Sequence, residues 1–422
     1  MRRPSTRLVS LSRVTSEHAQ TLSLTLTGED RPGVTSTILG AISATGAEVL
    51  DIQQVAVHGH LTLAVLLDPG DHSDELRDAA AVAAHRLGLS LTVLEGSGDN
   101  GRPRQGRAAV VVLGAPLLAD AVALVTAQIA NHGANIDRIR RLSRYPVTTV
   151  EFDISGAFVP SLRNELALVA ASSGIDIAVA PGGLARRGRR LVVLDVDSTL
   201  IQQEVIEMLA AHCGREEEVA AVTARAMAGE LDFEQSLRAR VATLAGLPES
   251  VLAEVSQDIV LTPGARTLVR TLRRLGFTVG LVSGGFIEIV GGLAAELGIH
   301  HVRANRLEIR DGVLTGALVG VVVDRAGKAA ALREFAELEG LPLSRTVAIG
   351  DGANDLDMLH IAGLGVAFNA KPLVREQAHT SVNVPYLDSV LYLLGITREE
   401  IEEADLSDGT PTAAPPVPGV HA

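Results

Sequence analysis

The feature that most constrains the fold is a short, uninterrupted apolar run at 191–194 (LVVL) that leads directly into Asp195 and Asp197. A strand that is apolar on both faces must be covered on both sides, as strands inside a parallel sheet are. Further strands are predicted at 278–282 and 346–349, with helical segments between them. This alternation predicts an α/β fold with a doubly wound, mostly parallel sheet, whose site forms at the carboxyl ends of its strands.

Residues 203–261 interrupt that alternation immediately after the first strand, and their pattern is mostly helical. We therefore predict a catalytic domain at 189–400 with a helical cap at about 203–261. A Gly- and Arg-rich break at 181–190 precedes this domain. The segment 401–422 is acidic and then rich in Pro and Ala, a composition that cannot build a core, so we predict a disordered tail there.

The N-terminal half contains an internal repeat. Alternating polar and apolar residues at 21–27 (TLSLTLT) predict a half-buried strand, and the order β-α-β-β-α-β follows from it. The same order returns after a polar break at 96–106, and a Gly-Ala pair marks the same helix-to-strand corner in both copies. We predict two ferredoxin-like βαββαβ domains, at 21–97 and 107–182, behind an N-terminal extension at 1–20.

Composition excludes several classes of function. Lys and Arg number 37 against 50 Asp and Glu, and aromatic residues make up only 2%, so a nucleic-acid surface is not expected. The N-terminus lacks the apolar stretch of a signal peptide, and no run reaches the roughly 18 apolar residues of a membrane span. The single cysteine, Cys213, cannot form an internal disulfide. We expect a cytoplasmic protein that binds neither nucleic acid nor membrane.

Asp195 and Asp197 place two carboxylates at the carboxyl end of a predicted strand. One carboxylate can attack phosphorus as a nucleophile, and the other can protonate a leaving alkoxide. Aspartates are also common in plain turns. The pair alone therefore leaves a turn cap and a phosphoryl-transfer site equally open.

Three further segments carry groups that suit a phosphate. Residues 283–285 (SGG) combine a hydroxyl with backbone amides that can form an anion-binding nest. Lys328 can neutralise phosphate as a point charge. Residues 350–355 (GDGAND) add two carboxylates and a carboxamide. Taken singly, these segments also fit a strand-ending turn, a solvated helix and an Asp-rich loop.

Together and in this order, DxDST at 195–199, SGG, Lys328 and GDGAND resemble the four motifs of haloacid dehalogenase-type phosphatases. The resemblance implies that Asp195 is the nucleophile and that Asp197 is the general acid and base. It further implies a set of phosphoryl-binding residues: Ser283, Gly284 and Lys328.

The same resemblance implies a Mg²⁺ site. The ion would be held by the Asp195 carboxylate, the Asp197 main-chain carbonyl and Asp351, while Asp355 would support the site. Mg²⁺ prefers one or two carboxylates, waters and a substrate phosphate oxygen, which agrees with this set.

Two stretches, 196–209 (VDSTLIQQEVIEML) and 233–246 (FEQSLRARVATLAG), resemble the phosphoserine phosphatases within this superfamily. The resemblance implies the following substrate contacts: Glu204 with the ammonium group, Arg240 with the carboxylate, Phe233 closing over the pocket and Asn354 beside the substrate. By themselves, the two charged residues fit ordinary solvated helix positions. The expected activity is hydrolysis of phosphoserine. The alternatives are hydrolysis of another small phosphate monoester, and a non-enzymatic amino-acid-binding regulator with a degenerate hydrolase domain.

The βαββαβ order, the Gly-Ala corner and the DRPG turn at 30–33 resemble ACT regulatory domains, although the second copy lacks this turn. Proline fixes φ, glycine permits close backbone approach, and helix-start amides can receive a carboxylate. The resemblance implies an amino-acid site at Asp30, Arg31 and Gly33, with serine as the candidate effector. It also implies edge-to-edge pairing of such domains into a homodimer. A plain strand-to-helix turn is the alternative for this segment.

Overall fold

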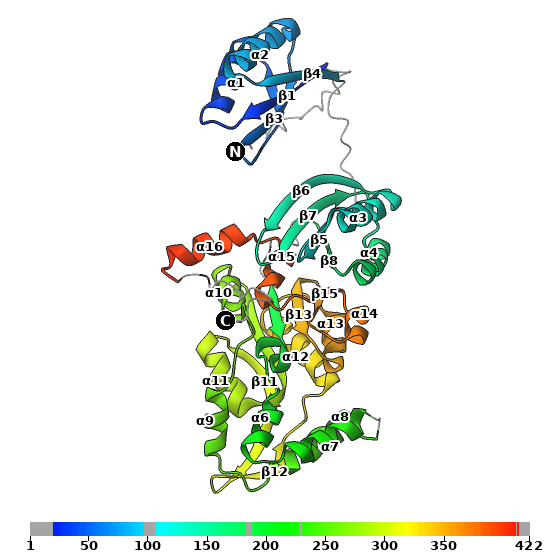
Figure 1. The fold of residues 1–422 in the computed structure, drawn as a ribbon, viewed down its shortest axis with the longest axis vertical. Coiled ribbons are helices and arrows are strands. Elements are labelled where there is room, and N and C mark those ends of the chain that lie inside the picture. Colours follow the sequence, from blue (N-terminus) through cyan, green and yellow to red (C-terminus); the bar gives the residue numbers. More distant parts are fainter. Residues whose placement is uncertain are drawn as a thin grey trace, which may run out of the picture. The chain divides into compact units, whose positions relative to one another are not determined.

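The computed structural model describes residues 20–96, 106–182, 188, 190–227, 230–410 and 412. The chain divides into two compact units, residues 1–103 and residues 104–422, which are described separately below (Figure 1). The predicted N-terminal extension lies outside the described residues except for Gln20.

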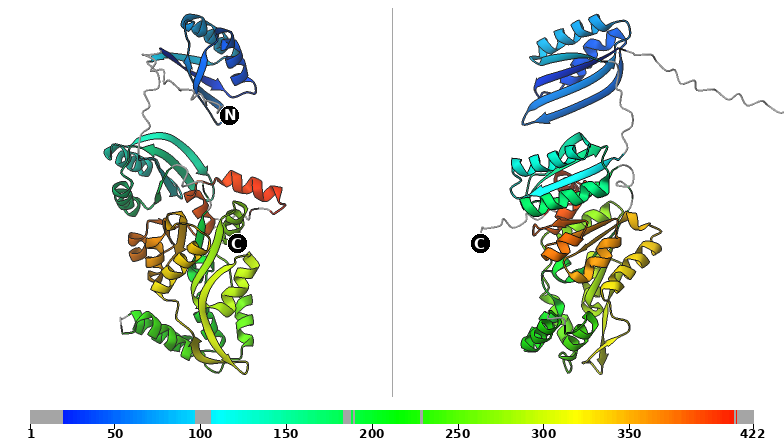
Figure 2. Two further views of the ribbon diagram at one scale, coloured as in Figure 1. Left: turned by 180° about the vertical axis from the view of Figure 1, so that it is seen from behind. Right: turned by 90° about the vertical axis from the view of Figure 1, so that its right-hand side faces the viewer.

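The first unit is a βαββαβ domain with a four-stranded antiparallel sheet of order β2-β3-β1-β4. Its two α-helices lie on the same face of the sheet (Figure 2). Leu22, Leu24 and Leu26 are fully buried in the core under these helices, as the alternating pattern of the first strand predicts. The elements are β1 (Thr21–Glu29), α1 (Val34–Ile42), η1 (Ser43–Thr45), β2 (Glu48–Val57), β3 (His60–Asp68), α2 (Ser73–Leu87) and β4 (Ser90–Gly96).

The second unit begins with another βαββαβ domain, whose sheet order β6-β7-β5-β8 repeats that of the first copy. The predicted duplication is thus present as two ferredoxin-like sheets. The elements are β5 (Ala108–Gly114), α3 (Ala119–Asn131), β6 (Asn135–Ser143), β7 (Thr148–Ser155), α4 (Val159–Ser173) and β8 (Asp176–Pro181).

Strand β5 differs from β1 because every one of its residues is buried. Val110 and Val112 face the helices of their own domain, whereas Val111 and Leu113 belong to the core of the catalytic domain. The contact is extended by polar groups: the Thr380 hydroxyl donates to the Ile177 carbonyl at 2.7 Å. The second βαββαβ domain is therefore packed against the catalytic domain through the open face of its sheet.

The catalytic domain has a seven-stranded sheet of order β12-β11-β10-β9-β13-β14-β15. All neighbours pair in parallel except β11 and β12, which form an antiparallel hairpin. The strands are β9 (Leu191–Leu194), β10 (Thr278–Phe286), β11 (His301–Arg310), β12 (Val313–Val319), β13 (Thr346–Gly350), β14 (Leu364–Phe368) and β15 (Thr380–Val382).

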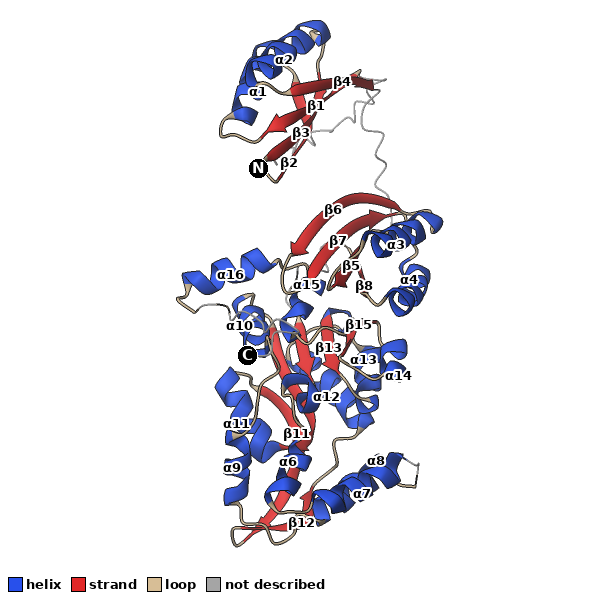
Figure 3. Ribbon diagram, viewed as in Figure 1, coloured by secondary structure: helices blue, strands red, loops and turns tan. Residues whose placement is uncertain are grey.

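Helices cover both faces of this sheet (Figure 3). On central strand β9, Val192 and Leu194 pack in the core with α10 and α11, while Leu191 and Val193 pack in the core with α12 and α13. The fully apolar LVVL run is thus buried on both faces, which confirms the predicted doubly wound sheet. The elements around the sheet are η2 (Val196–Leu200), α10 (Ala265–Arg274), α11 (Ile287–Leu297), α12 (Arg325–Leu338), η3 (Leu343–Arg345), η4 (Ala353–Asp355), α13 (Leu356–Ile361), α14 (Pro372–Gln377), η5 (Leu387–Ser389), α15 (Val390–Leu393) and α16 (Arg398–Ser407).

Four helices follow the first strand, where the helical cap is predicted: α6 (Val205–His212), α7 (Glu216–Met227), α8 (Phe233–Ala242) and α9 (Ser250–Gln257). The chain between α8 and α9 is tied to the β11–β12 hairpin, since Gly246 N donates to the Leu314 carbonyl and Leu314 N donates to the Leu247 carbonyl. The hairpin therefore supports one side of the cap. No helix within the described part of the chain is long and apolar enough to cross a membrane.

The predicted disordered tail at 401–422 is wrong in its first part, because α16 extends to Ser407. Ile401 is 1% exposed and Asp405 is fully buried, where it accepts hydrogen bonds from Arg270 and Arg274 of α10. Acidic composition suggested a solvated segment, but one of the acidic residues is the buried partner of two arginines. Residues 411 and 413–422 of the predicted tail lie outside the described residues.

Candidate active site

Asp195 stands at the carboxyl end of β9 and caps the turn that follows it. Its main-chain N–H donates to the Ile349 carbonyl of β13, so its position is fixed by the neighbouring strand. Its Oδ1 accepts from Val196 N at 2.8 Å and from Lys328 Nζ at 2.7 Å. Burial, and next the nearby Asp355, raise the pKa of Asp195 well above its ordinary value, while Lys328 acts to lower it. The hydrogen bonds that Oδ1 accepts from Val196 N and Lys328 Nζ oppose burial and favour the ionised form that a nucleophile needs.

Lys328 lies in the first turn of α12 and is completely buried between two carboxylates. Its Nζ is 2.7 Å from Asp195 Oδ1 and 2.8 Å from Asp355 Oδ1. Burial alone would lower the pKa of Lys328, but Asp195 and Asp355 outweigh burial and hold the pKa above its ordinary value. The lysine is thus a fixed positive charge beside the predicted nucleophile.

Asp197 follows two residues later and faces the second predicted motif. Its Oδ2 accepts from Ser283 Oγ at 3.0 Å, and its Oδ1 accepts from Val205 N at 2.9 Å. The Ser283 hydroxyl in turn accepts from Gly285 N at 2.7 Å. Burial raises the pKa of Asp197 in spite of these donors, which favours a carboxyl that can carry a proton.

Three carboxylates gather at the ends of β9 and β13. Asp195, Asp351 and Asp355 each offer one oxygen, and these oxygens lie within 4.8 Å of one another. The Thr199 hydroxyl donates to Asp351 at 3.4 Å. Burial and the neighbouring Asp355 raise the pKa of Asp351 to about 6, which is the expected result of buried like charges.

A divalent cation would relieve this concentration of negative charge, so the donor set fits a hard metal ion. Asp355 has both oxygens engaged, one by Lys328 Nζ at 2.8 Å and the other by Gly352 N at 3.0 Å. That geometry suits a residue that orients the site more than a direct ligand. Asp195 and Asp351 are then the side chains best placed to hold the ion.

The predicted substrate-recognition residues come from the start of the cap and from α8. Glu204 immediately precedes α6 and accepts from the Ser198 hydroxyl at 2.7 Å. Burial and, next, the charge of Asp197 raise the pKa of Glu204 to about 7. Burial lowers the pKa of Arg240, whereas Glu204 acts to raise it. The two charged groups are thus close enough to each other and to Asp197 to affect one another.

Arg240 Nε is buried and donates no hydrogen bond to any of the described residues. The ring of Phe233 lies beside Gly284 of the second motif. If Gly284 were replaced by a residue with a side chain, its Cβ would be 3.4 Å from Phe233 Cζ. Asn354 lies in η4 next to Asp355 and is partly buried. The structure therefore brings the predicted phosphoryl, metal and substrate residues to one end of the sheet.

Sequence reasoning missed three residues at the site. Ser198 adopts a left-handed conformation, with φ of 55°, and bonds Glu204, while Thr199 bonds Asp351. Both lie inside the DxDST motif, so their position was a usable signal. Asn305 is 3% exposed on β11 and contacts the SGG loop. A lone asparagine within a predicted strand was its only sequence signal.

The DRPG turn of the first unit lies between β1 and α1. Gly33 precedes α1 with φ of 92°, a conformation that favours glycine. Arg31 donates to the Leu87 carbonyl at the end of α2 and lies 3.8 Å from Glu29. Asp30 N donates to the Gly59 carbonyl. These contacts tie the turn to its own domain, so the arginine already has a structural role.

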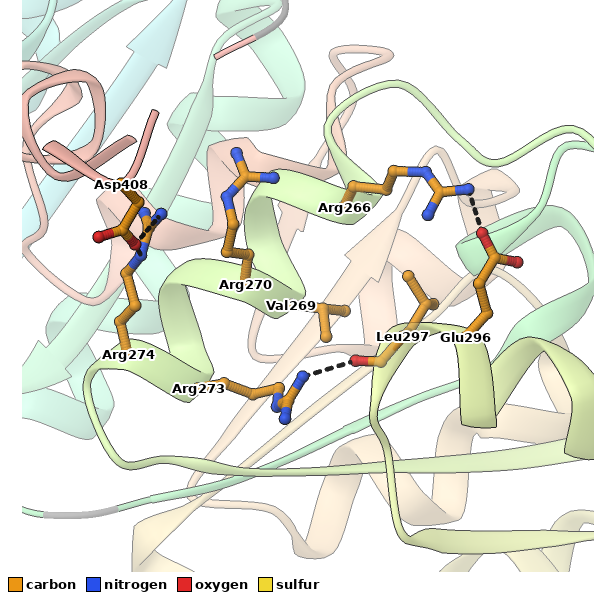
Figure 4. A pocket seen from close by; sticks show the side chains of 8 residues that line it. All are labelled: Arg266, Val269, Arg270, Arg273, Arg274, Glu296, Leu297 and Asp408. Atoms are coloured by element: carbon orange, nitrogen blue, oxygen red, sulfur yellow. Dashed lines mark hydrogen bonds and ion pairs between the residues drawn. The ribbon is translucent and has the colours of Figure 1, made fainter. Parts of the chain in front are cut away.

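A cavity of about 390 Å³ lies elsewhere in the catalytic domain and contains none of the predicted site residues (Figure 4). Its arginines have protein partners: Arg266 pairs with Glu296, Arg273 donates to the Leu297 carbonyl, and Arg274 pairs with Asp408. These contacts fasten α10 to its neighbours. The cavity is lined by Arg266, Val269, Arg270, Arg273, Arg274, Glu296, Leu297 and Asp408.

A doubly wound sheet with paired aspartates after its first strand, a buried lysine and an acidic cluster defines a haloacid dehalogenase-like hydrolase. Residues 192–360 match the family model of that description. Residues 20–93 and residues 107–180 each match a family model described as an ACT domain. The predicted fold class is therefore confirmed.

Two relatives show which family of haloacid dehalogenase-like hydrolases this chain belongs to. The phosphoserine phosphatase of Streptomyces coelicolor is 58% identical over 388 residues, which cover 91% of this chain and 94% of the relative. That of Mycobacterium tuberculosis is 53% identical and covers 91% of this chain and 95% of its own. The chain belongs to the phosphoserine phosphatase family, which confirms the predicted resemblance.

Solved structures agree with this assignment. A probable phosphoserine phosphatase from Vibrio cholerae has a TM-score of 0.54 and 35% identity, and the match covers 68% of this chain and 86% of that one. A haloacid dehalogenase-family hydrolase from Salmonella enterica serovar Typhi has a TM-score of 0.60 and 28% identity, covering 68% of this chain and 98% of that one.

Proposed function

We propose that this chain hydrolyses O-phospho-L-serine to L-serine and phosphate through a phosphoaspartate formed on Asp195. The observation that carries the proposal is the placement of Lys328 against Asp195, at 2.7 Å, in a site where the charge of Asp197 also acts to raise the pKa of Glu204 and of Arg240. A buried ammonium beside a nucleophilic carboxylate suits a phosphoryl group. An anionic and a cationic side chain nearby suit the zwitterionic part of an amino acid.

In the first half-reaction, an Asp195 carboxylate oxygen attacks phosphorus and the bond from phosphorus to the serine oxygen breaks. The serine alkoxide takes a proton from Asp197, whose raised pKa favours the protonated form before the step. Lys328 and the backbone amides around Ser283 stabilise the phosphoryl oxygens as charge develops on them.

In the second half-reaction, Asp197, now ionised, accepts a proton from water, and the water oxygen attacks phosphorus. The bond between phosphorus and Asp195 breaks, which releases phosphate and restores both carboxyl groups. Mg²⁺, held by Asp195, Asp351 and the Asp197 carbonyl, would offset repulsion between the anionic nucleophile and the anionic substrate. Asp355 would keep Lys328 in place.

The test is a panel of phosphate monoesters assayed with Mg²⁺, with phosphoserine and p-nitrophenyl phosphate among them. We expect phosphoserine to give the highest kcat/KM, and mass spectrometry of enzyme quenched during turnover to place phosphate on Asp195. Asp195→Asn is nearly isosteric but a poor nucleophile, so it should lose turnover and keep the fold. Phosphate on another residue would refute the mechanism. A preference for another small monoester would support the second candidate, a phosphatase of the same chemistry.

We further propose that the ACT domains bind an amino acid, with serine, the product, as the candidate effector at Asp30, Arg31 and Gly33. The proposed hydrolysis of phosphoserine would complete serine biosynthesis in the cytoplasm. Serine should change the rate of the full-length enzyme, and Gly33→Val should abolish that response without abolishing catalysis. If the response to serine is identical in this variant, the effect is product inhibition at the active site.

A homodimer is the proposed assembly. Every residue of the edge strand β2 is exposed, including Val49, Ile52, Val55 and Val57. Unpaired strand edges with apolar side chains favour pairing with another chain. Sedimentation equilibrium should give twice the chain mass, and Val55→Lys should lower it; a monomer in wild type would refute the proposal.

A further inference from the structure

The phosphate-binding motif is a bulge in the parallel pairing of β10 with β11. Gly280–Val282 pair with His301–Arg303, and pairing resumes at Phe286 opposite Asn305. Between these points β10 has three residues, 283–285, and β11 has one, Ala304. The two extra residues push the loop out of the ladder, so its backbone groups need other hydrogen-bond partners.

Asn305 supplies one such partner from the facing strand. Its Nδ2 donates to the Gly284 carbonyl at 2.8 Å, in the middle of the bulge. Its Oδ1 accepts from Val323 N at 2.7 Å. A carbonyl can only accept and an N–H can only donate, so these two partners fix the orientation of the amide. The side chain is 3% exposed, so water competes little for either bond.

The second contact leads to the lysine. Val323 directly precedes Asp324, which caps α12 by accepting from Gly327 N at 2.7 Å, and Lys328 N donates to the Asp324 carbonyl. Asn305 thus joins two segments that are far apart in sequence. One carries Ser283 and the other carries Lys328, the two side chains proposed to hold the phosphoryl group.

We propose that Asn305 is a positioning residue for phosphoryl transfer, which sets the spacing between the Ser283 loop and the start of α12. The inference rests on the proposed function only in that both segments contact the phosphoryl group. Among the described residues, the Asn305 side chain forms hydrogen bonds with Gly284 and Val323, and with neither reacting carboxylate. Its effect is therefore expected on the rate of phosphoryl transfer and on phosphate affinity, through the geometry of its neighbours.

The main test variant is Asn305→Asp, which keeps the size of the side chain and can still accept from Val323 N. It cannot donate to the Gly284 carbonyl when ionised, so it releases the bulge. We expect kcat to fall roughly 10- to 100-fold, the usual cost of a misplacement of about 1 Å at a reacting centre. The fall should be equal for phosphoserine and p-nitrophenyl phosphate because both carry the same phosphoryl group. Inorganic phosphate should inhibit more weakly.

Thr346→Val is the matched control. Thr346 is also fully buried, and its hydroxyl also joins two backbone segments, since it donates to the Leu343 carbonyl and accepts from Gly363 N. It stands at the start of β13, at the end of the sheet away from the site. This variant should lose thermal stability but keep kcat per folded molecule. Asn305→Ala provides a second disruption of the amide should the aspartate variant fold poorly.

A double-mutant cycle with Ser283→Ala separates positioning from general damage. If Asn305 acts through the Ser283 loop, Asn305→Asp should cost at least threefold less in the Ser283→Ala background than in wild type. Strict additivity, or a kcat per folded molecule equal to that of Thr346→Val, would overturn the inference. Because p-nitrophenyl phosphate does not depend on recognition of serine, a failure of the phosphoserine assignment would leave this test intact.

Discussion

Replacing Glu204 by glutamine should make the metal-free protein more stable at alkaline pH and, at the same time, a poorer phosphoserine hydrolase. Glu204 is partly buried, and its folded-state pKa rises from 4.5 to about 7, first because of burial and then because of Asp197. Glutamine keeps an oxygen that can accept from the Ser198 hydroxyl, at 2.7 Å in wild type, but it carries no charge. The substitution therefore removes the penalty of ionising this position.

The sign of the pH effect follows from linkage. A carboxyl whose folded pKa is raised contributes full stability below its unfolded pKa, and that stability is lost as pH rises through the folded pKa. A shift from 4.5 to about 7 corresponds to about 3 kcal/mol at most. The difference in the free energy of unfolding between the Glu204→Gln variant and wild type should therefore be small at pH 5 and should grow by roughly 2.5 kcal/mol by pH 8, in favour of the variant. The gain should level off above the folded pKa.

The assay is urea unfolding of both proteins from pH 5 to pH 8.5 with a chelator present, because a bound cation would lower the pKa of nearby carboxyls. Kinetics with Mg²⁺ form the second arm. Loss of a charge-assisted contact with the substrate ammonium should lower kcat/KM for phosphoserine about 10- to 100-fold. The rate with p-nitrophenyl phosphate, which has no ammonium group, should change little. Equal stability at every pH, or equal losses on both substrates, would refute the reasoning.

Three further changes test other parts of the site and fold. Asp197→Asn should slow phosphoenzyme formation by about 10² to 10⁴-fold in rapid-quench single turnovers, the usual worth of general acid catalysis. Arg240→Ala should raise KM for phosphoserine roughly tenfold to a hundredfold but scarcely change p-nitrophenyl phosphate kinetics. Asp405→Ala should cost roughly 3 kcal/mol in chemical unfolding, because Arg270 and Arg274 lose a fully buried partner, and should leave kcat unchanged.

Each of these has a clear contrary outcome. An unchanged single-turnover rate would exclude Asp197 as the acid. Equal damage to both substrates in the Arg240 variant would make that arginine structural. A drop in kcat with Asp405→Ala, measured on fully folded protein, would show that α16 affects the active site.

The sequence by itself determined the architecture and most of the site. An apolar run on both faces of a strand required a sheet covered on both sides, and the structure buries Leu191 and Val192 on opposite faces of β9. The motif residues meet because parallel strands place their carboxyl ends along one edge. Asp195 and Lys328 therefore lie 2.7 Å apart although 133 positions, from 195 to 328, separate them.

Other features depended on contacts that no local pattern encodes. The first strands of the two βαββαβ domains differ in sequence, alternating in TLSLTLT and continuously apolar in AAVVVLG. That difference indicates that β5 is covered on both faces, but only the structure identifies the catalytic domain as the cover. The burial of Asp405 was equally hidden from local sequence patterns. Its acidic neighbours predicted a solvent-exposed segment, whereas its arginine partners lie more than 130 positions earlier in the chain.

Asn305 shows most clearly what sequence patterns cannot predict. Periodicity and propensity report which face of a strand is buried, and they describe residues one to four positions apart. The need for a side-chain amide arises because a bulge in β10 deprives the Gly284 carbonyl of a ladder partner, while the N–H of Val323 reaches the same point from another segment. Sequence patterns determine which residues are buried, whereas the partners of a buried polar group are decided only when distant segments come together in the tertiary structure.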